Sequence, residues 1–279
     1  MDKSLAEMAT EVLTTGDGRA KTALSHAHAA AWRAAREAGD DIRIGQAAPP
    51  LRPARPDKPE LLDPRDVPRR RPGSDQGRIA MLHAVAHIEL NAVDLHWDII
   101  ARFTGVSMPM GFYDDWVQAA DDESKHFNLM CDCLEALGSY YGALPAHAGM
   151  WRAAEDTAED IFGRLAVVPM VLEARGLDVT PGMIDLFRKA GVTQAVEALE
   201  TIYAEEVSHV AYGSKWFHFL CGRNEADPKP MFHGLVRKYF HSTLRPPFNE
   251  EKRAEAGLPP DFYWPLTEDE GPRPPKKAP

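Results

Sequence analysis

The chain has 279 residues, of which 44% are hydrophobic, and it carries a formal net charge of −10. This length allows one large domain with additions or two small domains, and the acidic balance argues against broad binding to nucleic acids or anionic membranes. No stretch approaches the apolar run that a bilayer span requires, and the first residues lack the apolar core of a secretory signal. We therefore expect a cytoplasmic protein with no membrane association.

The cysteines are Cys131, Cys133 and Cys221, and none of them forms the paired spacing of a zinc ribbon or a rubredoxin module. An odd number of thiols fits a reducing compartment, in which free buried cysteines are the simplest interpretation.

The composition of the N-terminal part of the chain changes after Gly39. Residues 3–38 are rich in alanine and predict helix, whereas residues 45–73 are dense in proline and arginine and exclude regular helix or sheet. The simplest interpretation of the second stretch is an extended arm that wraps the main domain. The alternative is a basic patch for an RNA or protein partner.

The rest of the chain has the apolar periodicity of helices and almost none of the two-residue alternation of strands. Ser74 and Asp75 offer an N-cap for the first helix. The first three helices are predicted over residues 79–103, 113–137 and 151–175, the third with a stop at Gly176. A fourth helical segment opens at Thr180-Pro181, is interrupted near Gly191 and continues over residues 192–220. A shorter helix over residues 231–241 precedes a proline-rich tail.

Four long helices predict an all-α fold built on a four-helix bundle. The predicted domains are an N-terminal helical region (1–44), the Pro/Arg-rich arm (45–73), the bundle (74–222) and a C-terminal helix with a proline-rich extension (223–279).

Two Glu-x-x-His motifs lie on the predicted helices, Glu123-Ser-Lys-His126 and Glu206-Val-Ser-His209. Residues three apart share a helix face, so each motif can present a carboxylate and an imidazole to one point of a bundle core. A single Glu-x-x-His match arises readily by chance, so the prediction of a metal site depends on the other glutamates that accompany the two motifs.

Two further glutamates, Glu89 and Glu173, lie on strongly apolar helix stretches, where a carboxylate is costly to bury unless it is paired or bound to metal. Glu89 precedes Glu123 by 34 residues, and Glu173 precedes Glu206 by 33. This repeated order, a single Glu followed by Glu-x-x-His, is typical of bundles that hold two iron or manganese ions. Mixed carboxylate and imidazole donors suit those metals.

These residues resemble the ferritin-like di-iron carboxylate superfamily over about residues 75–220. The stretches RAKTALSHAHAAAWRAAR, RPARPDKPELLDPRDVPRRR and MLHAVAHIEL resemble, more narrowly, a bacterial ferritin-like family of unknown function, DUF455. The superfamily resemblance implies that the two metals are held by Glu89, Glu123, His126, Glu173, Glu206 and His209, with Glu123 and Glu206 bridging them.

The same resemblance implies that each acid preceding a motif supports the histidine of the other motif, pairing Asp122 with His209 and Glu205 with His126. The arginine that often precedes the histidine in the superfamily is replaced here by Lys125 and Ser208, which puts the usual salt-bridge network in doubt.

Three other residues lie near the predicted site. Tyr203, three residues before Glu206, is a candidate catalytic hydrogen-bond donor or radical site, with core packing as the alternative. His96, seven residues after Glu89, lies on the same face and is either a core residue or a third histidine ligand. Pro169 should kink or bulge its helix four residues before Glu173.

The sequence favours an O2-dependent di-iron oxidase or hydroxylase with two Fe ions (Mn as the alternative), an unknown small-molecule substrate and an electron donor. The polypeptide outside the bundle could wall a substrate pocket, and a monomer or homodimer is expected. The alternatives are a ferroxidase or iron-handling protein, a structural metal bundle, and a tRNA-modifying hydroxylase. The last of these remains an alternative because the arginine-rich arm could bind RNA. Met130 stands where the radical tyrosine of a ribonucleotide reductase is expected, which argues against that class.

Overall fold

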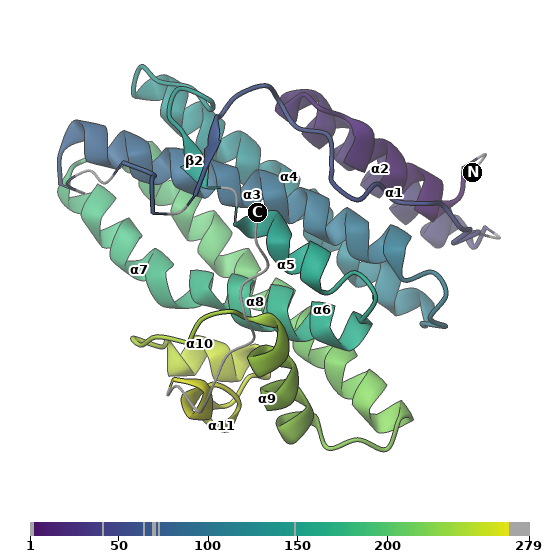
Figure 1. Cartoon of the computed structure of the whole chain (residues 1–279). Coiled ribbons are helices and arrows are strands. Elements are labelled where there is room, and N and C mark those ends of the chain that lie inside the picture. Colours follow the sequence, from purple (N-terminus) through teal and green to yellow (C-terminus); the bar gives the residue numbers. More distant parts are fainter. Residues whose placement is uncertain are drawn as a thin grey trace. The chain divides into compact units, whose positions relative to one another are not determined.

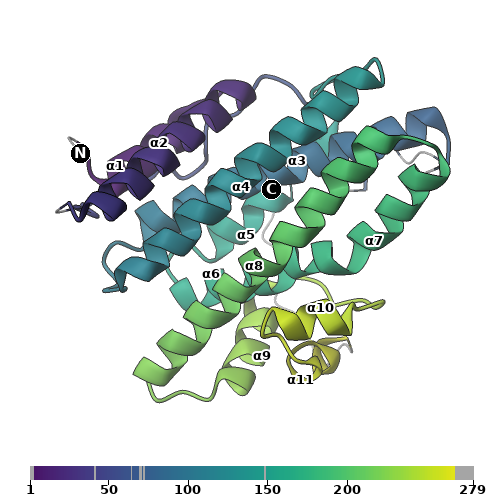
Figure 2. The same cartoon turned by 180° about the vertical axis from the view of Figure 1, so that it is seen from behind.

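The protein is described here by a computed structural model that covers residues 3–40, 42–63, 65–68, 71, 73–147 and 149–267. Regular structure in these ranges is helical apart from two strands of two residues each, which confirms the all-α prediction. The chain divides into two compact units, the first made of Met1–Glu155 and Gly182–Ile202, the second of Asp156–Pro181 and Tyr203–Pro279. Figures 1 and 2 show the helices from opposite sides.

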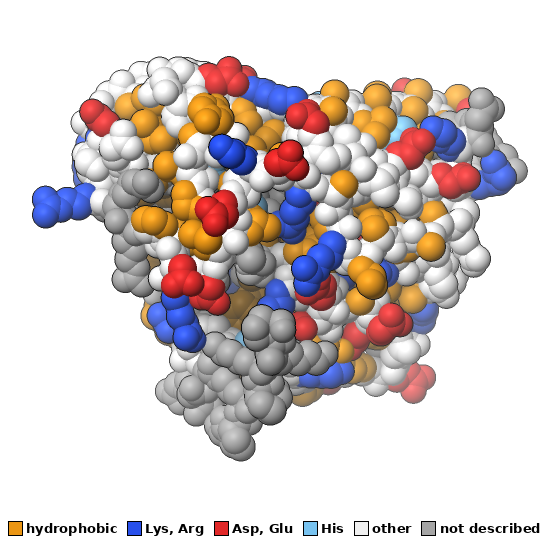
Figure 3. All heavy atoms as spheres, turned by 45° about the horizontal axis from the view of Figure 1, so that its top comes forward, with side chains coloured by type: hydrophobic (Ala, Val, Ile, Leu, Met, Phe, Trp, Pro, Cys, Tyr) orange, Lys and Arg blue, Asp and Glu red, His pale blue; other side chains and the backbone are white. Residues whose placement is uncertain are grey.

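On the face seen in Figure 3, basic and acidic side chains are interspersed among hydrophobic ones, and the coloured residues form no broad area of one charge. Within the described ranges, no helix combines the length and the apolar character that crossing a membrane demands.

The first unit is built on four helices, α1 (Leu5–Thr14), α2 (Gly18–Ala38), α3 (Asp75–Arg102) and α4 (Met110–Ala136), with α1 and α2 lying along α3 and α4 (Figures 1 and 2). Side-chain caps fix the starts of α1, α2 and α3, since Ser4, Asp17 and Ser74 each accept a bond from a first-turn N–H, whereas α4 begins after Pro109 without such a bond. Ser74 caps α3 as predicted, and α3 and α4 begin a few residues before their predicted starts.

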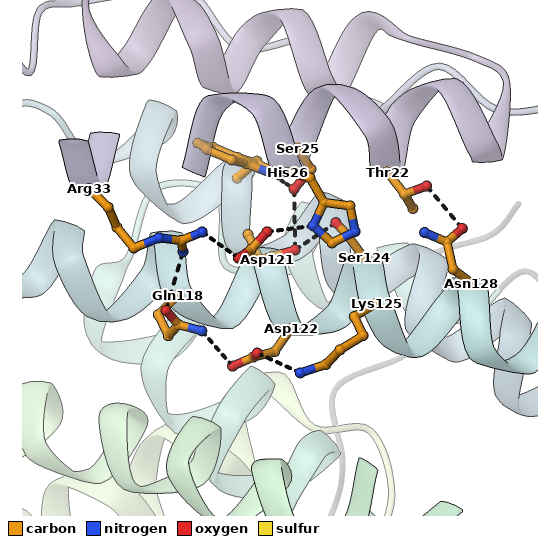
Figure 4. A network of polar contacts seen from close by, with 12 residues as sticks. Thr22, Ser25, His26, Arg33, Gln118, Asp121, Asp122, Ser124, Lys125 and Asn128 are labelled. Carbon is orange, nitrogen blue, oxygen red and sulfur yellow. Dashed lines mark hydrogen bonds and ion pairs between the residues drawn. The ribbon is translucent and has the colours of Figure 1, made fainter. Parts of the chain in front are cut away.

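A polar network joins α2 to α4 (Figure 4). Arg33 donates to Asp121 at 2.8 Å, and His26 Nδ1 lies 2.5 Å from the other oxygen of the same carboxylate. Thr22 donates to Asn128 at 3.2 Å. The indole of Trp97 on α3 reaches Ser25 on α2 at 2.8 Å, so α2 is tied to both long helices.

Residues 45–60, all of them described, form neither helix nor strand and run as an extended arm held by its own backbone carbonyls. Lys21 donates to the carbonyl of Ala54, Arg102 to that of Pro50, and the Trp151 indole to that of Leu51, at 2.9 Å each. The exclusion of sheet from 45–73 was wrong at one point, because β1 (Leu61–Leu62) pairs in parallel with β2 (Ala146–His147). Arg69 and Arg70, part of the arginine-rich end of the arm, lie outside the described residues.

The second unit carries α6 (Ile161–Val167), a π-helix η1 (Val168–Glu173) and the first half of α7 (Ala174–Lys189). It also holds the C-terminal part of α8 (Thr193–Arg223) and α9 (Pro228–Tyr239). The chain then forms α10 (Glu250–Glu255), α11 (Pro260–Tyr263) and the 3₁₀ turn η2 (Trp264–Leu266), short helices within the predicted proline-rich tail.

The predicted helix over 151–175 was wrong in two respects. It breaks after α5 (Met150–Asp156), because the side chain of Asp160 caps a new helix by accepting from the N–H of Gly163 at 3.0 Å. It also continues through Gly176 and Pro181, where the sequence predicted a stop and a new start. Burial of Leu177 and Ile184 on α7 accompanies that continuation and outweighs the local helix-breaking tendency. The predicted interruption at Gly191 is present, with φ +71°.

Candidate metal centre

Helices α3 and α4 pack along each other and carry four buried side chains with metal-binding groups. Glu89 and His96 come from α3, and Glu123 and His126 come from α4, with exposed fractions of 4% or less. The seven-residue spacing on α3 and the three-residue spacing on α4 place each pair on one helix face.

The donor atoms in this cluster lie at the separations of ligands that share an ion. His126 Nδ1 is 3.2 Å from Glu123 Oε2 and 3.5 Å from Glu89 Oε2. On the other side of the same carboxylate, His96 Nε2 is 3.6 Å from Glu123 Oε1. The ligand atoms of Glu89, Glu123 and His126 all lie within 4.8 Å of one another, so this cluster could hold a metal ion.

Electrostatics in the cluster favour a cation. Burial raises the pKa of Glu89 to about 8, and the neighbouring carboxylate of Glu123 acts in the same direction. At neutral pH the protein must therefore either keep a proton between these carboxylates or supply a positive charge. A divalent ion supplies that charge, and imidazole with carboxylate is a donor set that iron and manganese accept.

The other three predicted ligands lie in the second unit. Glu173 is the last residue of η1, and Glu206 and His209 lie on α8 with His209 Nδ1 3.9 Å from Glu206 Oε2. Both α8 side chains are buried. The predicted ligands thus fall into two sets of three, one in each unit, and their convergence on shared ions stays a prediction.

The bulge predicted at Pro169 is confirmed, since η1 begins at Val168 with Pro169 in its first turn. Proline has no N–H for the α-helical ladder, and a π-helical turn accommodates this loss. Helix α8 approaches the bulge so closely that a Cβ on Gly213 would lie 2.5 Å from Pro169. Only a residue without a side chain fits there.

Tyr203, the candidate catalytic residue, is half-buried on α8, and its hydroxyl accepts a bond from the side chain of Asn249 at 2.7 Å. Asn249 caps α10, so the hydroxyl is tied to the C-terminal segment. The catalytic role of Tyr203 stays a prediction. Asp122 accepts bonds from Gln118 and Lys125 (Figure 4), and its pairing with a histidine of the other motif also stays a prediction.

Sequence reasoning missed a second polar face of α3. It carries buried side chains at spacings of three or four residues: His83, His87, Asn91, Asp94 and Asp98. Each meets a specific partner. His83 accepts a bond from the N–H of Gly142 at 2.9 Å, and His87 Nδ1 lies 2.9 Å from the Tyr141 hydroxyl. Asn91 accepts a bond from Arg55 at 3.1 Å. Asp94 forms an ion pair with buried Lys21, and Asp98 forms one with Arg102 at 2.6 Å.

Because the metal-binding face and this polar face are both covered, every residue from 89 to 101 is buried. Two cavities adjoin the polar face of α3, and His87 lines both of them. One, of about 230 Å³, lies between α3 and arm residues 54–61, and the other, of about 280 Å³, lies between α3 and the residues around β2. The helical spacing of the polar residues was visible in the sequence. The extended arm was also predicted, but the face of α3 that it covers was not.

Comparison with known proteins adds family membership. No solved structure matches the chain. The chain is 40% identical to an uncharacterized protein of Haemophilus influenzae over 208 residues, which are 73% of this chain and 72% of that protein. The model of a family described as "Protein of unknown function (DUF455)" matches residues 14–264. The protein therefore belongs to the DUF455 family.

Proposed function

We propose that the two sets of three ligands converge in a ferritin-like four-helix bundle and hold two metal ions. The carrying observation is the buried cluster in which the two oxygens of Glu123 lie near different histidines, 3.2 Å from His126 and 3.6 Å from His96. A carboxylate with a nitrogen donor beside each oxygen is suited to bridge two ions. The repeated order of Glu and Glu-x-x-His along the chain supports the same arrangement.

The function we infer is that of a non-haem di-iron oxidoreductase, an O2-dependent oxidase or hydroxylase. A pair of carboxylate-held irons, when bound, supplies two electrons for chemistry with O2. The protein's own contribution would be to neutralise the ions with buried carboxylates, to hold them with Glu123 among the ligands, and to keep bulk water from a site whose side chains are nearly inaccessible. The net charge of −10 and the interspersed charges on the face seen in Figure 3 favour a small molecule over nucleic acid as substrate.

The first test is metal content and oxygen consumption. Protein purified from its native host should contain about two iron or manganese ions per chain, and the reduced protein should consume O2 in the presence of a suitable electron donor. The Glu123→Ala variant should lose both properties, because it removes the bridging carboxylate. Wild-type protein that binds no metal at any concentration would contradict the proposal.

Assembly distinguishes the oxidoreductase from an iron store. Size-exclusion chromatography with light scattering should give a monomer or a dimer with about two metals per chain. A shell of 12 or 24 subunits that accumulates many irons per chain would indicate storage instead, because a mineral needs an enclosed space.

A further inference from the structure

His96 is placed as a ligand would be placed, although it belongs to neither Glu-x-x-His motif. It lies two helical turns after Glu89 on the same face of α3, and its side chain is 1% exposed. Its Nε2 atom points to Glu123 Oε1 at 3.6 Å, while the other oxygen of that carboxylate lies beside His126.

The separations agree with coordination. First-row metal ions bind nitrogen and oxygen donors at roughly 2.0–2.2 Å, so two donors on one ion lie roughly 2.8–3.8 Å apart for angles between a right angle and about 120°. The distance from Nε2 of His96 to Glu123 Oε1 falls in the upper part of that range, and the corresponding distance at His126 also falls inside it.

Packing fixes the orientation of the imidazole. The ring of His96 stacks on Trp116 of α4, with centroids 5.3 Å apart and planes inclined by 25°. Trp116 is 1% exposed, so the stacked ring has no room to swing away from Glu123. A ring held this way presents Nε2 at a constant position, as a metal ligand requires.

We propose that His96 is a seventh ligand, bound to the ion on the Oε1 side of Glu123. The inference rests on the proposed two-metal function and goes beyond it, because it makes the two ions unequal. If each motif supplies one histidine to its own ion, as the proposed function requires, the ion bound by His96 would have two nitrogen donors and its neighbour would have one. An ion with two nitrogen donors differs from its neighbour in affinity and in redox potential.

The test compares His96→Phe, which keeps an aromatic ring against Trp116 but removes both nitrogens, with wild type in anaerobic titrations with Fe(II) and Mn(II). We expect wild type to bind two ions per chain. The variant should bind the first ion within about threefold of wild-type affinity and the second at least about tenfold more weakly. His83→Gln is the matched control, a buried histidine on the other face of the same helix whose amide oxygen can still accept from the N–H of Gly142.

A second readout counts nitrogen donors directly and needs no variant. Pulsed EPR of the Mn(II)-loaded wild-type protein, labelled with ¹⁵N-histidine, should detect three coordinated imidazoles per chain. Two imidazoles, or a His96→Phe variant that binds both ions as wild type does, would overturn the ligand role and leave His96 a packing residue. Wild-type protein that binds no ion would refute the two-metal function itself, so the two failures are distinguishable.

Discussion

At the scale of single residues, His87 links the polar face of α3 to acid sensitivity. Burial lowers its pKa from 6.5 to about 4, so the folded protein keeps it neutral while the unfolded chain binds a proton below pH 6.5. Its contribution to stability is therefore complete above pH 6.5 and is lost as the pH falls toward 4. We expect the free energy of unfolding to drop by about 2 kcal/mol between pH 7 and pH 5 from this group alone. Urea denaturation at the two pH values measures it.

The matching variants separate burial from hydrogen bonding. His87→Gln should reduce the difference in unfolding free energy between pH 7 and pH 5, because the glutamine side chain does not take up a proton in this pH range. Tyr141→Phe removes the hydroxyl beside His87 Nδ1 but keeps the imidazole buried, so it should preserve that difference. An unchanged pH dependence in His87→Gln would show that the acid sensitivity comes from other groups.

Single residues also show what a sequence can predict. Glu89, Glu123 and His126 were predicted from motif and spacing, and the structure brings those three together because both patterns follow helical periodicity. For His96 the sequence left two interpretations open, a core residue or a third histidine ligand. Asp94 could not be predicted, because an aspartate at helical spacing is normally solvent-exposed, and only Lys21 and the arm bury it.

At the scale of elements, helix α8 and the π-helix η1 are in close contact at Gly213. A Cβ at Gly213 would meet Pro169, which is part of the bulge and cannot turn aside. Gly213→Ala should therefore lower the free energy of unfolding by about 1–3 kcal/mol, as overpacking does in other cores. Gly222→Ala on the same helix is the control, since a Cβ there meets nothing within 4 Å. Equal stabilities for the two variants would mean that α8 shifts freely against η1.

A kink or bulge at Pro169 could be predicted, because proline lacks the N–H that an α-helix needs, but the π-helical form that it takes was not predicted. The continuation of α7 through Gly176 and Pro181 could not be predicted, since both residues favour a helix end locally and the opposing burial of Leu177 is a tertiary effect. The helix break before α6 also could not be predicted, because it involves a tertiary contact. It depends on Asp160, which caps the helix and also accepts a bond from Tyr239 at 2.8 Å, a residue 79 positions away.

At the scale of the whole molecule, the buried carboxylates predict that metal controls stability. Without a cation, Glu89 and Glu123 share a buried site only if a proton is held between them, since burial and the neighbouring carboxylate raise the pKa of Glu89 to about 8. Saturation of one site at about 100 times its Kd adds about 2.7 kcal/mol, which raises the Tm by roughly 5–10 °C for a chain of this size. Calorimetry with Fe(II) or Mn(II), then with a chelator, should show the increase and its reversal.

Glu123→Gln supplies the control for the metal effect. It removes the charge repulsion but leaves the volume of the side chain, so its metal-free form should be at least as stable as metal-free wild type and should respond weakly to added metal. A Tm that metal leaves unchanged in wild type and variant alike would argue against a metal site in this protein.

The unbroken burial of residues 89–101 also affects how the chain diverges over time. A helix with a solvent face accepts neutral substitutions there, but this stretch has none, and each position must satisfy either the carboxylate cluster, the polar face or an apolar contact. Substitutions should therefore accumulate more slowly here than in any other helix of the protein. In distant relatives this segment should remain alignable after the arm and the C-terminal helices no longer are.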